Sequence, residues 1–101
     1  MEPGSRKVIW APSAHVDLDE ALARRADPAR LLEEILDAAA SLSTLSERGR
    51  WVPELDDRTT REIFVRDFRL MYEVWNDHVH IVALMYGLRD FETWRQERER
   101  R

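Results

Sequence analysis

Residues 61–86 constrain the fold more than any other part of this chain. Their side chains alternate between apolar and polar in three segments, 61–65, 68–75 and 78–86. Arg66 and Asp67 separate the first two segments, and Asn76 and Asp77 separate the last two, as expected of tight turns. Because successive side chains of a strand point to opposite faces, the pattern predicts a three-stranded antiparallel meander with one apolar face.

A two-residue turn between the last two strands determines which side chains pair. Tyr72 is expected opposite Ile81, and an uninterrupted register places Phe68 opposite Met85 on the apolar face. The other face is expected to mix charged and apolar side chains: Glu62, Phe64, Arg69, Met71, Glu73, Trp75, His78, His80, Val82, Leu84 and Tyr86. Such a face rarely stays bare on a small domain, so we expect the C-terminal segment or a partner protein to cover part of it.

Two helices are predicted before the meander. After a strand over 6–10, Pro12 opens a helix that runs to about Ala26, and Pro28 opens a second helix that runs to about Leu45. Their apolar positions recur every three or four residues, which predicts a helical hairpin packed on the sheet by one face. Its outer surface is expected to be acidic, carrying Asp17, Asp19, Glu20, Glu33, Glu34 and Asp37.

The segments that flank the meander complete the predicted fold. Residues 46–57 are expected to form a loop, in which Gly49 could end the second helix. Residues 90–101 are expected to form a short final helix capped by Asp90, with Phe91 and Trp94 on one side. The predicted class is α/β (α+β) with the order βααβββα, in a single domain over residues 1–101.

Composition limits the classes of function. The chain has 101 residues, of which 44% are hydrophobic and 36% charged, and this fits one globular domain. A net charge of −4 lacks the basic balance of most nucleic-acid-binding proteins, and the absence of cysteine excludes disulfides and thiolate metal sites. No apolar run reaches the roughly 20 residues that span a bilayer, and residues 1–10 lack the apolar core of a signal peptide. We therefore predict a cytoplasmic protein with no membrane partner.

Two groups of side chains invite a functional interpretation. Glu73, His78 and His80 put three potential metal ligands on one face, but a cross-strand contact near a hairpin tip is the simpler interpretation, and we predict neither a metal nor a cofactor. Trp51 and Trp75 lie on the predicted loop and on the mixed face, positions that suit contact with another protein.

Three segments carry a wider resemblance: VIWAPSAHVDLDEAL (8–22), RGRWVPEL (48–55) and REIFVRDFRLMYEVWNDHVHIVALMYGLRD (61–90). In this order they resemble the RelE/ParE superfamily of bacterial type II toxins, over residues 7–91. The resemblance implies a toxin that causes growth arrest, takes part in plasmid stabilisation and is held inactive by a cognate antitoxin in a hetero-oligomer. It also implies a target, because the RelE-like branch cuts messenger RNA on the ribosome, whereas the ParE-like branch inhibits DNA gyrase by binding.

The departures from the RelE-like pattern favour the ParE-like branch. Arg69 matches the third-strand arginine of the ribosome-dependent members and Arg89 a later one, but Glu62 and Phe64 stand where those members usually carry lysines. No evident acid or base is left to move the proton of a 2′-hydroxyl. The alternatives are a ribosome-dependent mRNA endoribonuclease, in which case the chain is an enzyme, and a degenerate member that only binds its antitoxin.

The candidate site residues fall into two groups. Arg69, Arg89 and Tyr86 are expected to mark the active end of the sheet, with Arg69 facing outward on the side away from the helices. The residues expected to contact a target or partner are Trp51, Trp75, Glu62, Phe64 and Trp94.

Overall fold

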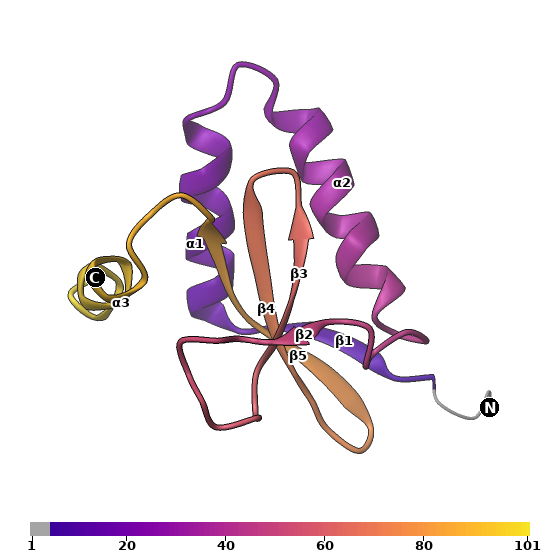
Figure 1. Ribbon diagram of the computed structural model, residues 1–101. Helices are drawn as coiled ribbons and strands as arrows, with labels where there is room; N and C mark the ends of the chain where they lie inside the picture. The colour runs from indigo at the N-terminus through magenta and orange to yellow at the C-terminus, as the bar shows by residue number, and fades with distance from the viewer. Residues whose placement is uncertain (1–4) are drawn as a thin grey trace.

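A five-stranded sheet with helices on both faces forms the structure, a computed structural model that describes residues 5–101 (Figure 1). The elements in chain order are β1 (Lys7–Trp10), α1 (Pro12–Ala23), α2 (Pro28–Ser41), β2 (Arg50–Trp51), β3 (Arg61–Val65), β4 (Phe68–Val74), β5 (His78–Tyr86) and α3 (Phe91–Glu99). The predicted βααβββα order is confirmed, with the two-residue strand β2 added inside the predicted loop.

The strands lie in the order β1-β5-β4-β3-β2. β3, β4 and β5 form the predicted antiparallel meander, and β1 pairs in parallel with β5. A parallel pair needs a crossover connection, and the hairpin of α1 and α2 lies within it. Among residues 5–101, no helix combines the length and the apolar character that crossing a membrane requires.

A β-bulge in β5 corrects the predicted register. Tyr72 lies opposite Ile81 as predicted, but Met71 lies opposite Ala83, which leaves Val82 as the extra residue. After this extra residue, each side chain of β5 points to the face of the sheet opposite to the one that a ladder without a bulge would give it. Phe68 therefore pairs with Tyr86, and the predicted pairing of Phe68 with Met85 is wrong.

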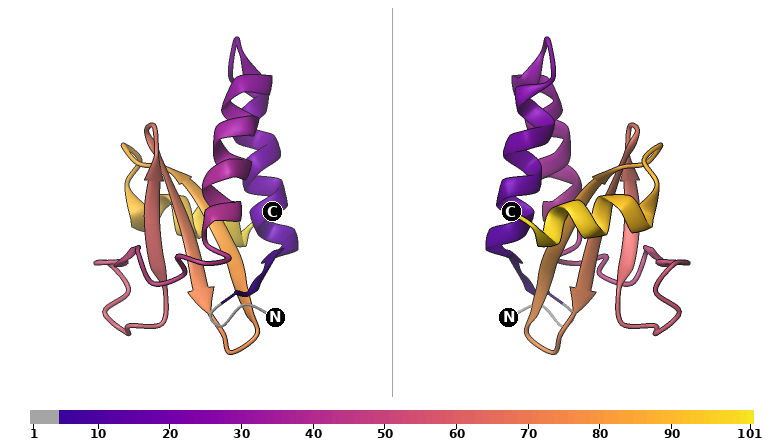
Figure 2. Two further views of the ribbon diagram at one scale, coloured as in Figure 1. Left: turned by 90° about the vertical axis from the view of Figure 1, so that its right-hand side faces the viewer. Right: turned by 90° about the vertical axis from the view of Figure 1, so that its left-hand side faces the viewer.

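Figure 2 shows α1 and α2 on one side of the sheet and α3 on the other. Each face of the sheet has its own apolar cluster. On the face covered by α1 and α2, the buried side chains are Ala14, Leu18, Leu31, Ile35, Ala39, Leu42, Ile63, Val65, Phe68, Leu70, Tyr72, Val79, Ile81 and Leu84. On the opposite face, α3 covers a smaller cluster of Val52, Met71, Ala83, Met85, Phe91 and Trp94. The C-terminal segment thus covers part of the mixed face, as expected. Leu84 and Tyr86 were predicted on that mixed face, but the bulge places them on the opposite face, in the apolar cluster beneath α1 and α2.

The helix ends differ from the predicted ones. α1 ends at Ala23 and α2 at Ser41, each a few residues before the predicted end. Gly49 does not end a helix but precedes β2, where its N–H donates to the Tyr72 hydroxyl (2.9 Å). Asp90 caps α3 as predicted, because its side chain accepts the Thr93 N–H (2.9 Å).

Candidate functional site

Arg69 lies on the sheet face opposite the helical hairpin, but it is buried rather than outward-facing. Only 6% of its surface is exposed. Its Nε donates to Oε1 of Glu62 (2.6 Å), and its two terminal nitrogens donate to the two carboxylate oxygens of Glu54 (2.9 and 2.6 Å). Arg50 donates to the other oxygen of Glu62 (2.7 Å). Arg69, Glu54, Glu62 and Arg50 form what we call the buried ion cluster.

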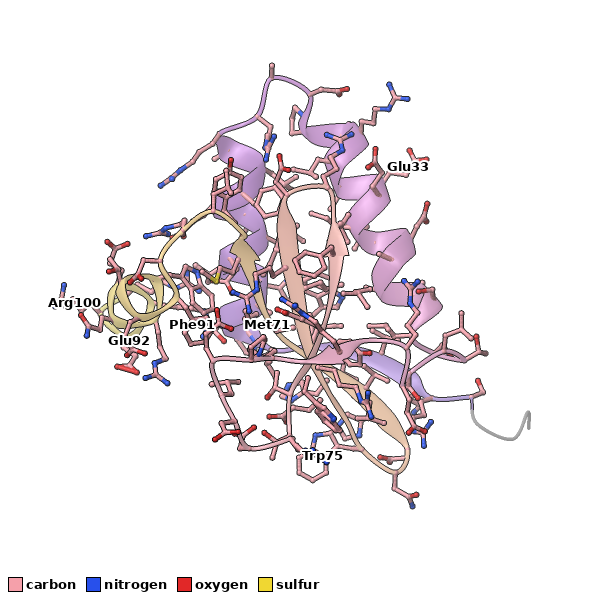
Figure 3. The ribbon with its side chains drawn as sticks, in the orientation of Figure 1. Glu33, Met71, Trp75, Phe91, Glu92 and Arg100 are labelled. Atoms are coloured by element: carbon pink, nitrogen blue, oxygen red, sulfur yellow. The ribbon has the colours of Figure 1, made fainter. Side chains whose placement is uncertain are left out.

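The cover over this cluster comes from distant parts of the chain. The Phe91 ring at the start of α3 lies 5.6 Å from the Arg69 guanidinium, and Phe91 packs with Met71 and Val52 in the same apolar cluster (Figure 3). The expectation that Arg69 faces outward is therefore wrong. Glu62 is 1% exposed, so its carboxylate is directed at two arginines and away from any partner.

The electrostatics of the cluster favour a permanent, structural pairing. The hydrogen bond from Arg69 lowers the pKa of Glu54, and the Glu54 carboxylate in turn raises the pKa of Arg69 above its usual value. Both groups stay charged at neutral pH. The Arg69 guanidinium directs its hydrogen bonds at the carboxylates of Glu54 and Glu62 and at the Met85 sulfur, which leaves it poorly placed to bind a phosphate.

Tyr86 and Arg89 lie together in a cleft between α1, the end of β5 and α3. The cleft has a volume of about 520 Å³ and is lined on its α1 side by Glu20, Arg24 and Arg25. Tyr86 reaches this side of the sheet because of the bulge, and its ring packs edge-on against Phe68 (centroids 5.7 Å apart). Two of the three active-end candidates thus share a cleft, while Arg69 lies beneath α3 in the buried ion cluster.

Asp17 forms a second polar centre, which the sequence did not predict. It was expected on the acidic outer surface, but it is 4% exposed and faces β5 and α3. Its Oδ2 accepts the Leu84 N–H (3.0 Å) and the Arg98 Nε (3.0 Å), and its Oδ1 accepts from Arg101. Ala14 and Ala21 of the same helix lie three residues before and four residues after Asp17, on the side that faces the sheet. This spacing in the sequence indicates that Asp17 shares their inward-facing side of the helix.

The exposed aromatic side chains lie on another part of the molecule. Trp51 and Trp75 are 38% and 54% exposed, and they line one hollow of about 610 Å³ with Arg61 and Glu73. The Arg61 guanidinium lies 3.9 Å from the Trp51 ring, and the Trp75 Nε1–H donates to Glu73 (3.2 Å). Phe64 on β3 is 56% exposed.

The remaining contact candidate is not at the surface. Trp94 is 7% exposed because α3 presents it to the sheet, in the apolar cluster that also holds Phe91 and Met85. We call Trp51, Phe64 and Trp75 the exposed aromatic residues. Figure 3 shows Trp75 near the tip of the hairpin formed by β4 and β5, well away from α3.

The histidines considered as metal ligands make other contacts. His78 stacks on Trp75 (2° between planes), and its Nδ1 lies 2.8 Å from the Asp77 carboxylate. Glu73 pairs with His80 across the strands, as the predicted register required. Within residues 5–101, no three His, Asp or Glu side chains are grouped as a metal site would need.

The fold and its two polar centres define a small α+β domain, and a comparison with known families identifies its family. Residues 8–91 match the model of the family described as "ParE toxin of type II toxin-antitoxin system, parDE". Because the match covers most of the sequence, the chain belongs to the ParE toxin family of type II toxin–antitoxin systems. No curated protein matches the sequence.

Two solved structures share the fold at low sequence identity. A chain of the chromosomal ParDE toxin–antitoxin system from P. aeruginosa superposes with a TM-score of 0.69 at 14% identity, covering 82% of this chain and 97% of that chain. A chain of the E. coli DinJ-YafQ toxin–antitoxin complex superposes with a TM-score of 0.53, also at 14% identity, covering 81% of this chain and 92% of that chain.

Proposed function

We propose that this chain inhibits DNA gyrase by binding it, and that a cognate antitoxin neutralises this inhibition. The observation that carries the proposal is the buried ion cluster. Arg69 is the arginine that a ribosome-dependent nuclease would direct at RNA, yet here it is buried and bound by Glu54 and Glu62. A toxin that acts by binding does not need this arginine to be free.

The comparisons support the same choice of branch. The family whose model matches is the ParE toxin family, and one similar structure belongs to a ParDE system. The second similar structure comes from a toxin–antitoxin complex as well, which supports an antitoxin as the first partner of this chain.

The exposed aromatic residues are the best candidates for the gyrase contact. Large aromatic side chains dominate the energetics of many protein interfaces. Trp51, Phe64 and Trp75 are exposed on a domain that covers both faces of its sheet with helices. Replacing Trp51 and Trp75 by alanine should weaken growth inhibition without unfolding the domain, whereas Leu36→Ala, at a comparably exposed apolar residue on α2, serves as the control.

Induced expression without the antitoxin tests the proposal. Filamentation with a DNA-damage response is the expected result, because an inhibited gyrase blocks chromosome replication. Rapid loss of translation with cleaved messenger RNA would instead assign the chain to the nuclease branch. Normal growth in the presence of folded protein would leave only a role in antitoxin binding.

A further inference from the structure

The cleft between α1 and α3 carries positive charge on a chain whose total charge is −4. It continues into a second hollow of about 430 Å³, which shares the residues Glu20, Arg24, Arg89 and Trp94 with the first. The two hollows together are lined by five arginines and three carboxylates. This imbalance leaves two positive charges along the cleft.

The three carboxylates are already bound by arginines of the cleft itself. Arg98 and Arg101 bind Asp17. Arg101 also binds Glu20 (3.1 Å), and Arg89 binds Glu97.

Arg24 and Arg25 are the two unbalanced charges, since neither has a carboxylate partner among residues 5–101. Arg25 instead places its guanidinium 4.9 Å from the Phe68 ring, and both arginines stand at the end of α1.

The floor of the cleft is apolar. Phe68, Leu84 and Trp94 are each less than a tenth exposed, and Tyr86 is half-buried beside them. An occupant would therefore place an apolar side chain on this floor and carboxylates at the arginines on the rim. Two joined hollows also suit an extended segment better than a compact ligand.

We infer that this cleft binds an acidic segment of the antitoxin that carries an aromatic or aliphatic side chain between its carboxylates. An antitoxin segment in this position covers Tyr86 and Arg89, the two active-end candidates that remain accessible. The inference rests on the antitoxin partner proposed above and is independent of the gyrase target.

Titration with two synthetic peptides tests the chemistry of the cleft directly. One peptide has glutamates on both sides of a phenylalanine, and the other has the same length with glutamine in place of each glutamate. With 15N-labelled protein, the acidic peptide is expected to shift the indole N–H signal of Trp94 and to leave that of Trp51 in place. The glutamine peptide should bind much more weakly.

Charge reversal links this binding to Arg24 and Arg25. The double variant Arg24→Glu/Arg25→Glu should bind the acidic peptide at least about tenfold more weakly, because it turns two attractive contacts into repulsive ones. Arg58→Glu makes the same kind of charge change at an exposed residue that lines the hollow beside Trp51, and it should leave affinity unchanged. Equal binding by all variants, or no binding of the acidic peptide to the parent, would overturn the inference.

Expression in cells distinguishes this inference from the proposed function. The double variant is expected to inhibit growth like the parent and to be neutralised less well by the co-expressed product of the adjacent gene. Full neutralisation of a toxic double variant would refute the cleft assignment alone. Loss of toxicity with antitoxin binding unchanged would assign the cleft to the target instead. Absence of any growth inhibition by the parent would refute the proposed function, and the peptide titration would still decide the inference.

Discussion

Replacing Arg69 by methionine tests whether the buried ion cluster is structural. The substitution preserves much of the side-chain volume and removes the charge. Glu62, whose side chain is fully buried, then keeps only Arg50, whose side chain is 55% exposed. Removing one partner of a buried ion pair costs about 3–5 kcal/mol. Because Arg50 remains, we expect a loss of about 3 kcal/mol, toward the lower end of that range.

The contact with Glu54 adds little to this figure. The Glu54 side chain is 37% exposed, so water replaces much of the lost interaction, and we assign it less than about 1 kcal/mol. For a domain of this size, each kcal/mol corresponds to roughly 4–8 °C of melting temperature, so Tm should fall by about 12–24 °C. Urea denaturation gives the free energy of unfolding, and thermal denaturation gives Tm.

Two variants make this prediction refutable. Arg89→Met breaks an ion pair with Glu97 in which both side chains are at least a third exposed, and it should cost less than about 1 kcal/mol. The double variant Arg69→Met/Glu62→Gln also removes the buried carboxylate charge that Arg69 no longer balances, and it should regain at least about 1 kcal/mol over Arg69→Met alone. An Arg69→Met protein as stable as the parent, or a double variant that regains nothing, would refute the reasoning.

Three further predictions concern packing, the attachment of α3 and pH. Gly49→Ala should destabilise the fold by about 1–3 kcal/mol in urea denaturation, because a Cβ there would lie 2.4 Å from the Tyr72 hydroxyl oxygen and 2.7 Å from the Glu62 carbonyl oxygen. Asp17→Asn should weaken the attachment of α3 by about 1.5–3 kcal/mol, seen as faster amide hydrogen exchange in α3 and not in α2, whereas Asp19→Asn at an exposed position should change neither. The hydrogen bond from Arg69 lowers the pKa of Glu54 in the folded state, so the stability that this contact contributes is present above pH about 4.5 and is lost as the pH falls through the lowered pKa. Glu54→Gln should therefore lose less stability than the parent protein when the pH is lowered from about 4.5. An equal dependence of unfolding free energy on pH in the two proteins would contradict this.

The alternation of apolar and polar residues predicted the three-stranded meander, but it did not predict for every residue which face of the sheet its side chain takes. The pattern placed Tyr72 and Leu70 on the hairpin side, and both are fully buried there. It failed beyond Val82, because a bulge adds one residue without any distinctive local sequence. Tyr86 therefore faces the α1 side, a placement that a ladder drawn by hand does not give.

The candidate site was predicted in part, for a related reason. Arg69 was identified through the family resemblance, whereas Trp51 and Trp75 were identified from their residue type and position, and both tryptophans are exposed. The burial of Arg69 was not predictable, because it depends on Glu54 and on α3 folding back over the sheet from distant parts of the chain. Local patterns report which face a side chain takes, and only long-range packing determines what covers that face.

The sequence predicted that the C-terminal segment, with Phe91 and Trp94 on one side of its helix, could cover the mixed face of the sheet. It did not predict how this segment is attached to α1. Arg98 and Arg101, near the end of the chain, bind the buried Asp17 on α1. A carboxylate on the inner stripe of an amphipathic helix needs a partner, since burying an unpaired charge is costly. That argument from Asp17 would have predicted a cationic partner, though not which arginines supply it.

DNA supercoiling by purified gyrase, measured with increasing amounts of the purified chain, is the most direct test of the proposed function. The expected result is a dose-dependent loss of supercoiling that the antitoxin reverses, with messenger RNA left intact in a parallel ribosome assay. Full supercoiling activity at every toxin concentration, together with cleavage of ribosome-bound messenger RNA, would contradict it.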